Sequence, residues 1–247
     1  MNEEYIIGKN PVLEALRSER DMNKIWIAEG SQKGTMQQII TLAKERNIFV
    51  NFVPKKKIDQ MTEGIHQGVV AQVAAYSYAE VDDLFAVAES REEAPFFILL
   101  DEIEDPHNLG SIMRTADAVG AHGIIIPKRR AVGLTATVAK SSTGAIEYIP
   151  VARVTNMSRT IDELKERGVW IVGTDALGTD DYRNMDGKMP IGLVIGSEGK
   201  GMGRLIKDKC DFLIRMPMIG KVTSLNASVA AGLLMYEVYR KRNPIGE

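Results

Sequence analysis

Residues 190–228 read PIGLVIGSEGKGMGRLIKDKCDFLIRMPMIGKVTSLNAS and contain two strand-to-loop units in succession. The apolar run 191–195 leads into a loop, residues 196–203, that holds four glycines. A second apolar run, residues 212–216, precedes a helix that we expect to begin with Ser224 as its cap. Glycine permits positive φ and lets a ligand lie directly against the backbone. Because open α/β sheets bind ligands at the carboxyl ends of their strands, this stretch predicts a small-molecule site.

The glycine loop fits neither of two common phosphate-binding patterns. A Walker loop has a glycine five positions before its Gly-Lys pair and Ser or Thr after that pair. Here Gly199-Lys200 has Val194 and Gly201 at those positions. The dinucleotide pattern G-x-G-x-x-G fails as well, because its third glycine position holds Arg204. A phosphate cradle is therefore disfavoured, while a ligand held by backbone amides and carbonyls without phosphates remains open.

Strands and helices alternate regularly between residue 95 and this stretch. Apolar runs that predict strands lie at residues 96–102, 123–127, 148–151 and 170–175. Patterns that predict helices lie between them, at residues 108–121, 134–142 and 157–167. Asn108 is the expected cap of the first of these helices. Buried strands alternating with helices are typical of a parallel sheet covered on both faces, so we expect an α/β fold.

The first 75 residues read as a separate and smaller α/β unit. Its helices are predicted to begin at Asn10-Pro11 and to cover residues 35–46. Its strand patterns lie at residues 24–28, 48–53 and 69–76. The segment that follows is acidic and rich in alanine, which is typical of a linker with a short helix. We therefore expect a domain at residues 1–75, a linker at 76–95 and a second domain at 96–247.

Composition excludes several classes of protein. With 247 residues and 45% hydrophobic composition, the chain can form one large or two medium domains with buried cores. The single cysteine, Cys210, cannot form an intramolecular disulfide, and the N-terminus lacks the basic and then apolar pattern of a signal peptide. We therefore expect a cytoplasmic protein. No apolar run approaches the ~20 residues that cross a bilayer, and the three histidines lack metal-ligand spacing, so we expect neither membrane nor metal.

The charge pattern leaves a nucleic-acid partner open. The net charge is −2, but residues 76–95 hold six acidic residues and one basic residue, so the remaining chain is slightly basic. The run Lys55-Lys56-Lys57 has the chemistry to contact RNA phosphates, although a solvated helix face is the favoured interpretation. His66 lies in the sequence GIHQG and either stacks on a base or closes a turn, and we favour the turn.

The C-terminal helix, expected at residues 224–242, is apolar almost all round between residues 227 and 236. A surface helix would show a single apolar stripe. The pattern is therefore equally compatible with a central core helix and with a helix shared between the core and a subunit interface.

Several polar residues of this half are weak signals when taken one at a time. Asn108 and Arg114 lie six positions apart in one predicted helix, so their side chains project about 120° apart. An arginine in a helix is usually an ion-pair partner at the surface, and Glu198 would ordinarily be a loop carboxylate. Ser224 and Asn226 would ordinarily be helix caps. Their arrangement in three motifs is more informative.

The three motifs together resemble a known family. The segments are DPHNLGSIMRTADAVGA, LVIGSEGKGMG and RMPMIGKVTSLNASVA. In this order and at these separations they resemble the signature motifs of the SpoU (TrmH) family of S-adenosylmethionine-dependent RNA ribose 2′-O-methyltransferases. The resemblance spans residues 96–247. Residues 1–75 resemble the RNA substrate-binding domain of the subgroup that methylates a guanosine in the peptidyl-transferase P-loop of 23S ribosomal RNA.

This resemblance implies a fold and an assembly. The second domain is expected to be an α/β trefoil-knot (SPOUT) domain with a parallel sheet, and the small N-terminal α/β domain is expected to bind the RNA substrate. The protein is expected to be an obligate homodimer. A knot departs from the general rule that chain connections are unknotted, so the expectation rests on the resemblance alone.

The resemblance also implies roles for individual residues. Asn108 and Arg114 match the catalytic pair of the first motif, and Glu198 matches the acid of the second. Ser224 and Asn226 match the polar pair of the third. The residues implied to contact the methyl donor, S-adenosylmethionine, are Thr174, Gly196, Gly201, Met216, Pro217 and Leu225.

The implied reaction is an in-line displacement in which a ribose 2′-hydroxyl attacks the sulfonium methyl group. Arg114 is the expected activator. Because a guanidinium does not lose its proton in proteins, we expect Arg114 to fix the target phosphate and to stabilise the developing alkoxide.

The sequence alone leaves other functions open. A transfer-RNA loop is an alternative substrate, and knotted relatives also methylate a base nitrogen. A non-catalytic RNA- or ribosome-binding protein on the same fold is the competing class. The intact set of Asn108, Arg114, Glu198 and Asn226 favours the enzyme, because a pure binding protein has no need of it.

Overall fold

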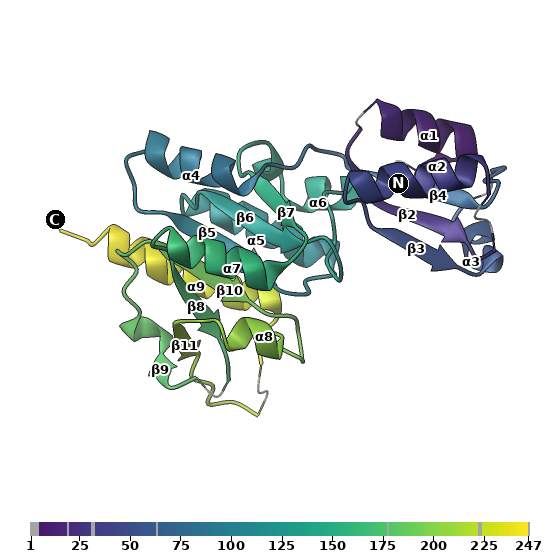
Figure 1. The fold of residues 1–247 in the computed structure, drawn as a ribbon. Helices are drawn as coiled ribbons and strands as arrows, with labels where there is room; N and C mark the ends of the chain where they lie inside the picture. The colour runs from purple at the N-terminus through teal and green to yellow at the C-terminus, as the bar shows by residue number, and fades with distance from the viewer. Residues whose placement is uncertain are drawn as a thin grey trace. The chain divides into compact units, whose positions relative to one another are not determined.

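The chain folds into two compact units (Figure 1). The computed structural model describes residues 5–18, 20–30, 33–62, 64–176, 178–221 and 224–246. One unit comprises Met1–Ser77 together with Gly133–Thr137, and the other comprises Tyr78–Val132 and Val138–Glu247. The boundary after Ser77 lies close to residue 75, where the sequence predicts the end of the first domain.

The first unit is a small mixed sheet with helices on both faces. Its described residues form strands in the order β1-β4-β2-β3, in which β2 and β3 are parallel and the other neighbours are antiparallel. The elements are β1 Tyr5–Ile7, α1 Lys9–Arg17, β2 Met22–Ala28, α2 Thr35–Glu45, β3 Val50–Val53, α3 Lys55–Asp59 and β4 Val69–Val73. Val69 and Ala71 of β4 belong to the core beneath α1 and α2, whereas Val70 packs with Ile58 of α3. The two-residue period of a strand therefore divides this core into two layers.

The second unit is built on one parallel sheet. Its described residues form seven strands in the order β7-β6-β5-β10-β8-β11-β9, and every neighbouring pair is parallel. The strands are β5 Phe96–Leu100, β6 Gly123–Pro127, β7 Val151–Val154, β8 Trp170–Thr174, β9 Asp180–Asp181, β10 Ile191–Ile195 and β11 Phe212–Arg215. β5 and β10 are buried along their whole length, as their continuous apolar runs predict. The predicted α/β class is confirmed, while the knot implied by the resemblance stays a prediction.

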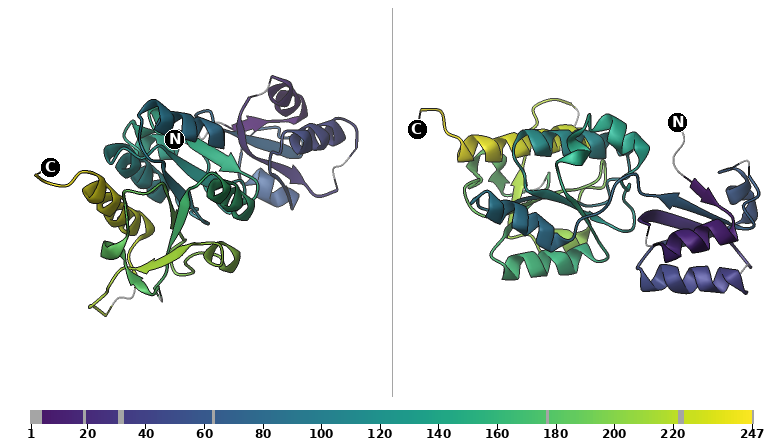
Figure 2. Two further views of the ribbon diagram at one scale, coloured as in Figure 1. Left: turned by 60° about the vertical axis from the view of Figure 1, so that its left-hand side comes forward. Right: turned by 90° about the horizontal axis from the view of Figure 1, so that it is seen from above.

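Helices cover both faces of this sheet (Figure 2). The helices from residue 78 onward are α4 Val81–Ser90, α5 Pro106–Ala118, α6 Ala136–Ser141, α7 Met157–Glu166, α8 Arg204–Lys207 and α9 Ala227–Arg242, with short 3-10 helices η1 Ala145–Glu147 and η2 Tyr182–Asn184. The first two residues of α6 belong to the first unit. α4, α7 and α8 share one core with Phe97 and Leu99 of β5. α5 and α9 pack against each other on the opposite face. The sheet is therefore the middle layer of three.

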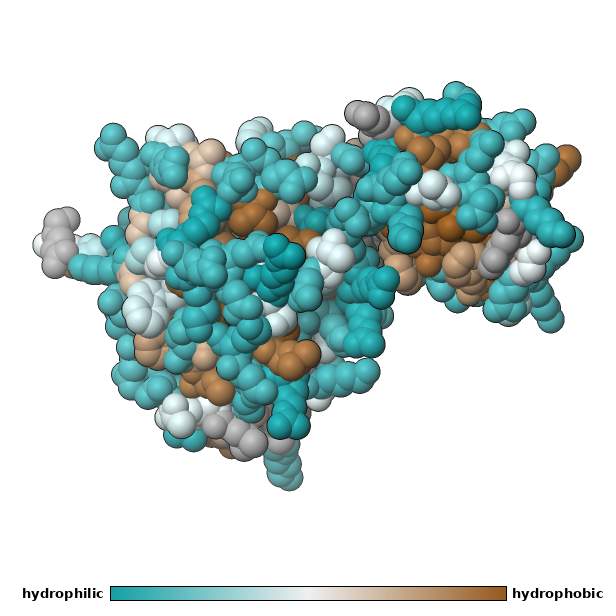
Figure 3. All heavy atoms as spheres, viewed as in Figure 1, coloured by the Kyte–Doolittle hydropathy of each residue, from teal (hydrophilic) through white to brown (hydrophobic). Residues whose placement is uncertain are grey.

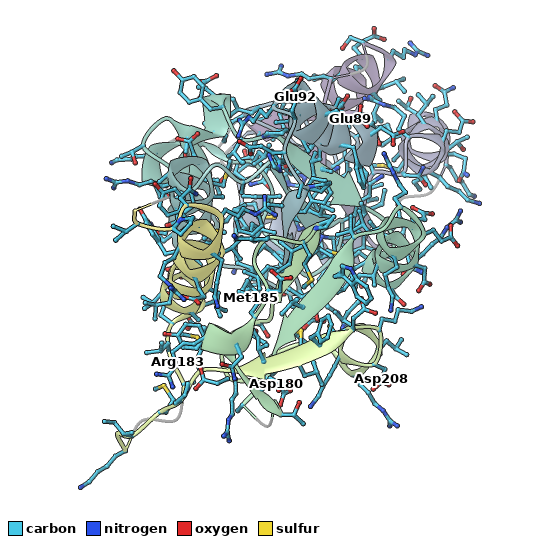
Figure 4. All side chains as sticks on the ribbon, turned by 90° about the vertical axis from the view of Figure 1, so that its left-hand side faces the viewer. Glu89, Glu92, Asp180, Arg183, Met185 and Asp208 are labelled. Atoms are coloured by element: carbon cyan, nitrogen blue, oxygen red, sulfur yellow. The ribbon has the colours of Figure 1, made fainter. Side chains whose placement is uncertain are left out.

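The visible surface of the second unit is mostly hydrophilic, with small separate apolar patches (Figure 3). Charged side chains such as Glu89 and Glu92 near the end of α4, and Asp208 at the end of α8, are exposed (Figure 4). None of the helices in the described ranges is both long and apolar enough to cross a bilayer. In the same ranges, His, Cys, Asp and Glu side chains do not gather in groups of three that could hold a metal ion.

The predicted linker contains the expected short helix, but this helix is part of the core of the second unit. α4 begins after Glu80, which forms a reciprocal capping box with the first turn. Leu84 is fully buried, and the ring of Phe85 packs edge-to-face against Phe97 with 4.9 Å between ring centroids. The acidic residues of 76–95 therefore lie on the exposed side of α4 and in the segments on either side of it.

Two helices begin at other residues than the sequence predicts. Asp105 caps α5 by accepting a hydrogen bond from a backbone N–H of the first turn at 2.8 Å, so Asn108 lies inside the helix and is not its cap. Pro106 favours this earlier start, because its φ is already close to helical. Asn226 caps α9 through its side-chain oxygen, Oδ1, so Ser224 is not the cap. Neither the Asn108 side chain nor the NH2 group of Asn226 is used in capping.

His122 is a fully buried polar residue that connects the start of β5 to the segment after α4. Its Nδ1 accepts a hydrogen bond from the Phe96 N–H at 2.9 Å, and its Nε2 lies 2.9 Å from a carboxylate oxygen of Glu93. Nε2 therefore carries the proton and donates it. Burial is the largest cause that lowers the pKa of His122, the hydrogen bond to Glu93 opposes this shift, and the charges of Arg91 and Arg242 add to it.

We predict that His122→Asn makes the stability of the protein less dependent on pH. The pKa of His122 lies below its ordinary value of 6.5 in the folded chain, so the unfolded chain binds more protons and stability falls as pH drops through 6.5. The variant cannot form the hydrogen bond to Glu93 and should be about 1–3 kcal/mol less stable at pH 8. Its free energy of unfolding should then fall less than that of the parent between pH 8 and pH 5, as measured by urea unfolding.

The control is His107→Asn, which changes an exposed histidine and should retain the pH dependence of the parent protein. An equally steep fall of stability in His122→Asn would contradict the assignment of a neutral, buried imidazole.

Candidate active site

Three neighbouring strands end at the same edge of the large sheet. β8 lies between β10 and β11, and all three are parallel. Neighbouring strands are about 5 Å apart, so the loops that follow them begin within about 10 Å of one another. All six residues implied to contact the methyl donor lie at these strand ends or in the loops after them: Thr174, Gly196, Gly201, Met216, Pro217 and Leu225.

The glycine loop after β10 is closed by its own backbone. Ser197 and Gly201 exchange two backbone hydrogen bonds, of 3.1 and 2.9 Å. Gly199 and Gly201 have φ values of 79° and 67°, and a Cβ at either position would meet open space. Gly196 differs, because a Cβ there would lie 2.3 Å from the backbone of Gly201. The loop itself therefore requires glycine at position 196, whatever ligand it binds.

Asp101, which directly follows β5, anchors the far end of this loop. Its Oδ2 accepts a hydrogen bond from the Gly203 N–H at 2.7 Å, and its own N–H donates to the Ile195 carbonyl at 2.9 Å. Burial raises the pKa of the Asp101 carboxyl above its ordinary value, and the hydrogen bond from Gly203 opposes that shift. Sequence reasoning missed Asp101. The signal that could have found it was an aspartate placed directly after a fully apolar strand, where burial requires a partner.

A hydrogen-bonded cluster joins the three motifs at this edge. Glu198 Oε1 accepts hydrogen bonds from Asn108 Nδ2 at 3.3 Å and from the Ala227 N–H at 3.1 Å. It also accepts one from Asn226 Nδ2, which donates to Asn108 Oδ1 at 3.0 Å as well. Because the carbonyl oxygen of Asn226 caps α9, both polar atoms of this side chain have partners and its orientation is fixed. Three residues from separate motifs are thus in direct contact.

Arg114 and Ser224 do not join this cluster. Both are exposed, and neither the guanidinium nor the Ser224 hydroxyl forms a hydrogen bond or an ion pair within the described ranges. Six positions along α5 separate Arg114 from Asn108, which turns the two side chains about 120° apart. The structure therefore brings together Asn108, Glu198 and Asn226, and leaves the other two predicted residues open to solvent.

The loop between β11 and α9 has the properties that an adenosine site needs. Residues 218–221 form no hydrogen bond with any other described residue, so within the described chain their backbone N–H and C=O groups have no partner. Met218, Ile219 and Leu225 add exposed apolar side chains to the same loop. An adenine ring has two apolar faces and a hydrogen-bonding edge. The apolar side chains of this loop match the faces of an adenine ring, and its backbone groups match the hydrogen-bonding edge.

Both units match families of known proteins. Residues 95–236 match the SpoU rRNA Methylase family, and residues 5–79 match the domain described as RNA 2′-O ribose methyltransferase substrate binding. The chain belongs to the SpoU rRNA methylase family. It is therefore an RNA methyltransferase of a family that uses S-adenosylmethionine, as the three motifs predicted.

Relatives of this SpoU methylase extend over almost the whole chain. A Bacillus subtilis (strain 168) protein named as a TrmH family tRNA/rRNA methyltransferase is 72% identical over 244 residues, which is 99% of this chain and 98% of that protein. The SpoU methyltransferase AviRb from Streptomyces viridochromogenes, crystallised with the cofactor AdoMet, is 27% identical with a TM-score of 0.62 and coverage of 96% and 90%. The AdoMet-bound rRNA methyltransferase from Sinorhizobium meliloti is 29% identical with a TM-score of 0.60 and coverage of 96% and 86%.

We predict that two glycines of this SpoU methylase respond differently to alanine. Gly196→Ala places a methyl group against the loop backbone, so it should lower the free energy of unfolding by about 2 kcal/mol or more even without a ligand. Gly199→Ala meets only the cost of positive φ, about 1 kcal/mol. Urea unfolding without added S-adenosylmethionine measures both. Equal stabilities of the two variants would contradict the close approach at Gly196.

Proposed function

We propose that this chain methylates the 2′-hydroxyl of a guanosine ribose in large-subunit (23S) ribosomal RNA, with S-adenosylmethionine as the methyl donor. The observation that carries the proposal is the contact among Asn108, Glu198 and Asn226 beside the loops that follow β8, β10 and β11. Family membership supports methylation of RNA. The resemblance of residues 1–75 to the P-loop guanosine subgroup supports the 23S substrate, and this substrate places the enzyme in the cytoplasm.

The proposed reaction forms a bond between the 2′-oxygen and the methyl carbon as the bond from that carbon to sulfur breaks. S-adenosylmethionine supplies the methyl group when bound. The cluster of Asn108, Glu198 and Asn226 holds the glycine loop against the starts of α5 and α9, which aligns the two sides of the site. Arg114 fixes a phosphate of the target and stabilises the charge that develops on the 2′-oxygen as its proton leaves. A guanidinium keeps its own proton, so Arg114 acts through its charge.

The donor and the RNA are assigned to different parts of this edge. Thr174 Oγ1 donates a hydrogen bond to the Val194 carbonyl at 3.3 Å, which joins the ends of β8 and β10. We assign the donor to the backbone around this bond and to the loops after β10 and β11, including Gly196, Met216 and Leu225. The exposed Ser224 hydroxyl is assigned to the RNA side.

We infer that the first unit selects the RNA. Every candidate catalytic residue lies in the second unit, and residues 5–79 match a substrate-binding domain. The three lysines of α3 are exposed and can reach phosphates. His66, in contrast to these lysines, is buried. Its Nδ1 accepts a hydrogen bond from the Gly68 N–H at 3.0 Å, and its Nε2 lies 2.7 Å from a carboxylate oxygen of Asp59. This is the turn that the sequence favours.

A transfer-RNA ribose is the second candidate substrate, because the Bacillus subtilis relative is named for both tRNA and rRNA. Labelled methyl transfer to 23S ribosomal RNA and to total transfer RNA separates the two, and mapping of ribose methylation in a strain that lacks the gene identifies the nucleotide. We expect one 23S guanosine to be modified. Methylation of transfer RNA alone would replace the proposed substrate. A folded protein that binds no S-adenosylmethionine would overturn the enzyme function itself.

Arg114→Ala should lower the rate of methyl transfer by about 100- to 1000-fold, because it removes the charge beside the reacting oxygen. The affinity for S-adenosylmethionine should not change, since Arg114 forms no hydrogen bond or ion pair with the described residues of the loops assigned to the donor. Arg114→Lys keeps the positive charge but lacks the planar guanidinium group. Its rate should therefore lie between the rates of the parent protein and of Arg114→Ala. Single-turnover kinetics and calorimetry measure these effects. Near-normal transfer by Arg114→Ala would remove this residue from the mechanism.

We propose that the chain forms a homodimer through α9. Val229, Leu233 and Tyr236 recur at helical spacing and are 50%, 46% and 52% exposed, while Leu234 and Met235 are buried. α9 is thus a half-buried helix whose second apolar side is left uncovered by the described residues. A second copy of the same stripe is apolar and self-complementary, as a two-fold interface requires.

Leu233→Asp should convert the dimer into a monomer, because it places a charge in the centre of the apolar stripe. Leu205→Asp is the matched control, since Leu205 is 71% exposed on α8 and outside the stripe. Light scattering at micromolar concentration gives the mass of each protein. A monomeric parent, or a Leu233→Asp variant that stays dimeric, would contradict an interface on α9.

A further inference from the structure

Two cations lie side by side where β6 and β7 end. Lys128 directly follows β6, and its N–H donates to the Val154 carbonyl at 2.8 Å. Arg153 of β7 pairs with Ile126 of β6. Because side chains alternate along a strand, residues 126 and 128 project to the same face, so Lys128 and Arg153 are diagonal neighbours.

Lys128 has no ion-pair partner among the described residues. It is half-buried. Burial and then the charge of Arg153 lower the pKa of Lys128, and Glu80 opposes this shift. The guanidinium of Arg153 lies 4.3 Å from the ring centroid of Tyr78, which holds it in place. Like charges held together and partly desolvated are typical of sites that bind an opposite charge.

This pair is fixed beside the catalytic loop. β6 is the neighbour of β5, and the loop after β5 leads into α5 with Asn108. The Val132 N–H donates to the Ile103 carbonyl at 2.9 Å, which connects the loops after the two strands.

A second connection between these loops is an ion pair. Arg130 and Glu102 are 2.8 Å apart, and both have positive φ, of 54° and 59°. Positive φ is a strained backbone conformation for both residues and is concentrated at functional sites. Arg129, which precedes this pair, is exposed.

We propose that Lys128, Arg129 and Arg153 form a subsite for backbone phosphates of the RNA strand next to the target nucleotide. The inference rests on the proposed function, because it needs the target ribose at Asn108 and Glu198. β6 and β7 lie one and two strands from β5, about 5 and 10 Å along the edge. An RNA strand that runs from the catalytic cluster along this edge of the sheet brings its next phosphates over Lys128, Arg129 and Arg153. Phosphate contacts of this kind fix the register of the strand and do not read its sequence.

The test compares RNA binding by full-length variants over a range of salt concentrations. The probe is a fragment of 23S ribosomal RNA that contains the peptidyl-transferase P-loop. For Lys128→Ala, and for Lys128→Ala combined with Arg153→Ala, the slope of log affinity against log salt should fall by about 0.7–0.9 for each phosphate that the variant no longer neutralises. S-adenosylmethionine affinity should be unchanged. Arg91→Ala, an exposed arginine at the opposite edge of the sheet, is the control and should keep the slope of the parent.

Unfolding measurements separate this role from a structural one. Removing a half-buried cation that has no ion pair should not lower stability, so Lys128→Ala should unfold at the same urea concentration as the parent or a higher one. Lower stability with an unchanged salt slope would overturn the subsite.

The outcomes also separate the subsite from the proposed function. If the parent protein methylates 23S RNA, but the slope of its log affinity against log salt equals that of the double variant, the subsite alone is overturned. A reduced slope in the variants, with RNA binding but no methyl transfer by the parent, would support the subsite and overturn the proposed reaction. A parent that binds no RNA would overturn both.

Discussion

One carboxylate oxygen, Glu198 Oε1, holds together parts of the chain that are far apart in sequence. It accepts hydrogen bonds from Asn108 in α5, from Asn226 before α9 and from the first N–H group of α9. A carboxylate at this position also interacts favourably with the positive end of the α9 dipole. Because the glycine loop, α5 and α9 each carry one motif, the relative placement of all three motifs depends on this atom. Asn108, Glu198 and Asn226, which the sequence indicates as catalytic, therefore also hold these three segments together.

The second constraint is that contacts within the protein fix the conformation of the glycine loop. Ser197 and Gly201 close it, Gly196 permits its close return, and Asp101 binds its far end. A loop that is ordered during folding gives up little conformational entropy when a ligand binds, which favours affinity. Fixed dipoles of a preorganised loop are also the main source of electrostatic catalysis in enzymes, which is consistent with the role proposed for this loop.

Most of the fold could be predicted because buried parallel strands are continuous apolar runs, as in β5 and β10. The errors lie where two local signals compete or where a pattern is short. Asp105 and Asn108 are both good caps, and Pro106 decides between them. The strand predicted at 148–151 is β7 at Val151–Val154, because Ala145–Glu147 first form a 3-10 helix. β1 and β9 are too short for a pattern. In the site, the motifs singled out Asn108, Glu198 and Asn226 as functional residues, but their mutual contacts come from the structure. Asp101 belongs to no motif, and its burial and its hydrogen bond to Gly203 show its importance.

The polar residues at this edge fall into two groups, according to whether the chain supplies their partners. Asn108, Glu198 and Asn226 satisfy one another, so their replacement should affect stability as well as activity. Arg114 is exposed and has no partner among the described residues, at little cost, because water solvates its charge. Lys128 is half-buried, so its desolvation carries a cost that an anion would offset. Residues of the second group are more informative about the ligand, because folding alone does not account for their position.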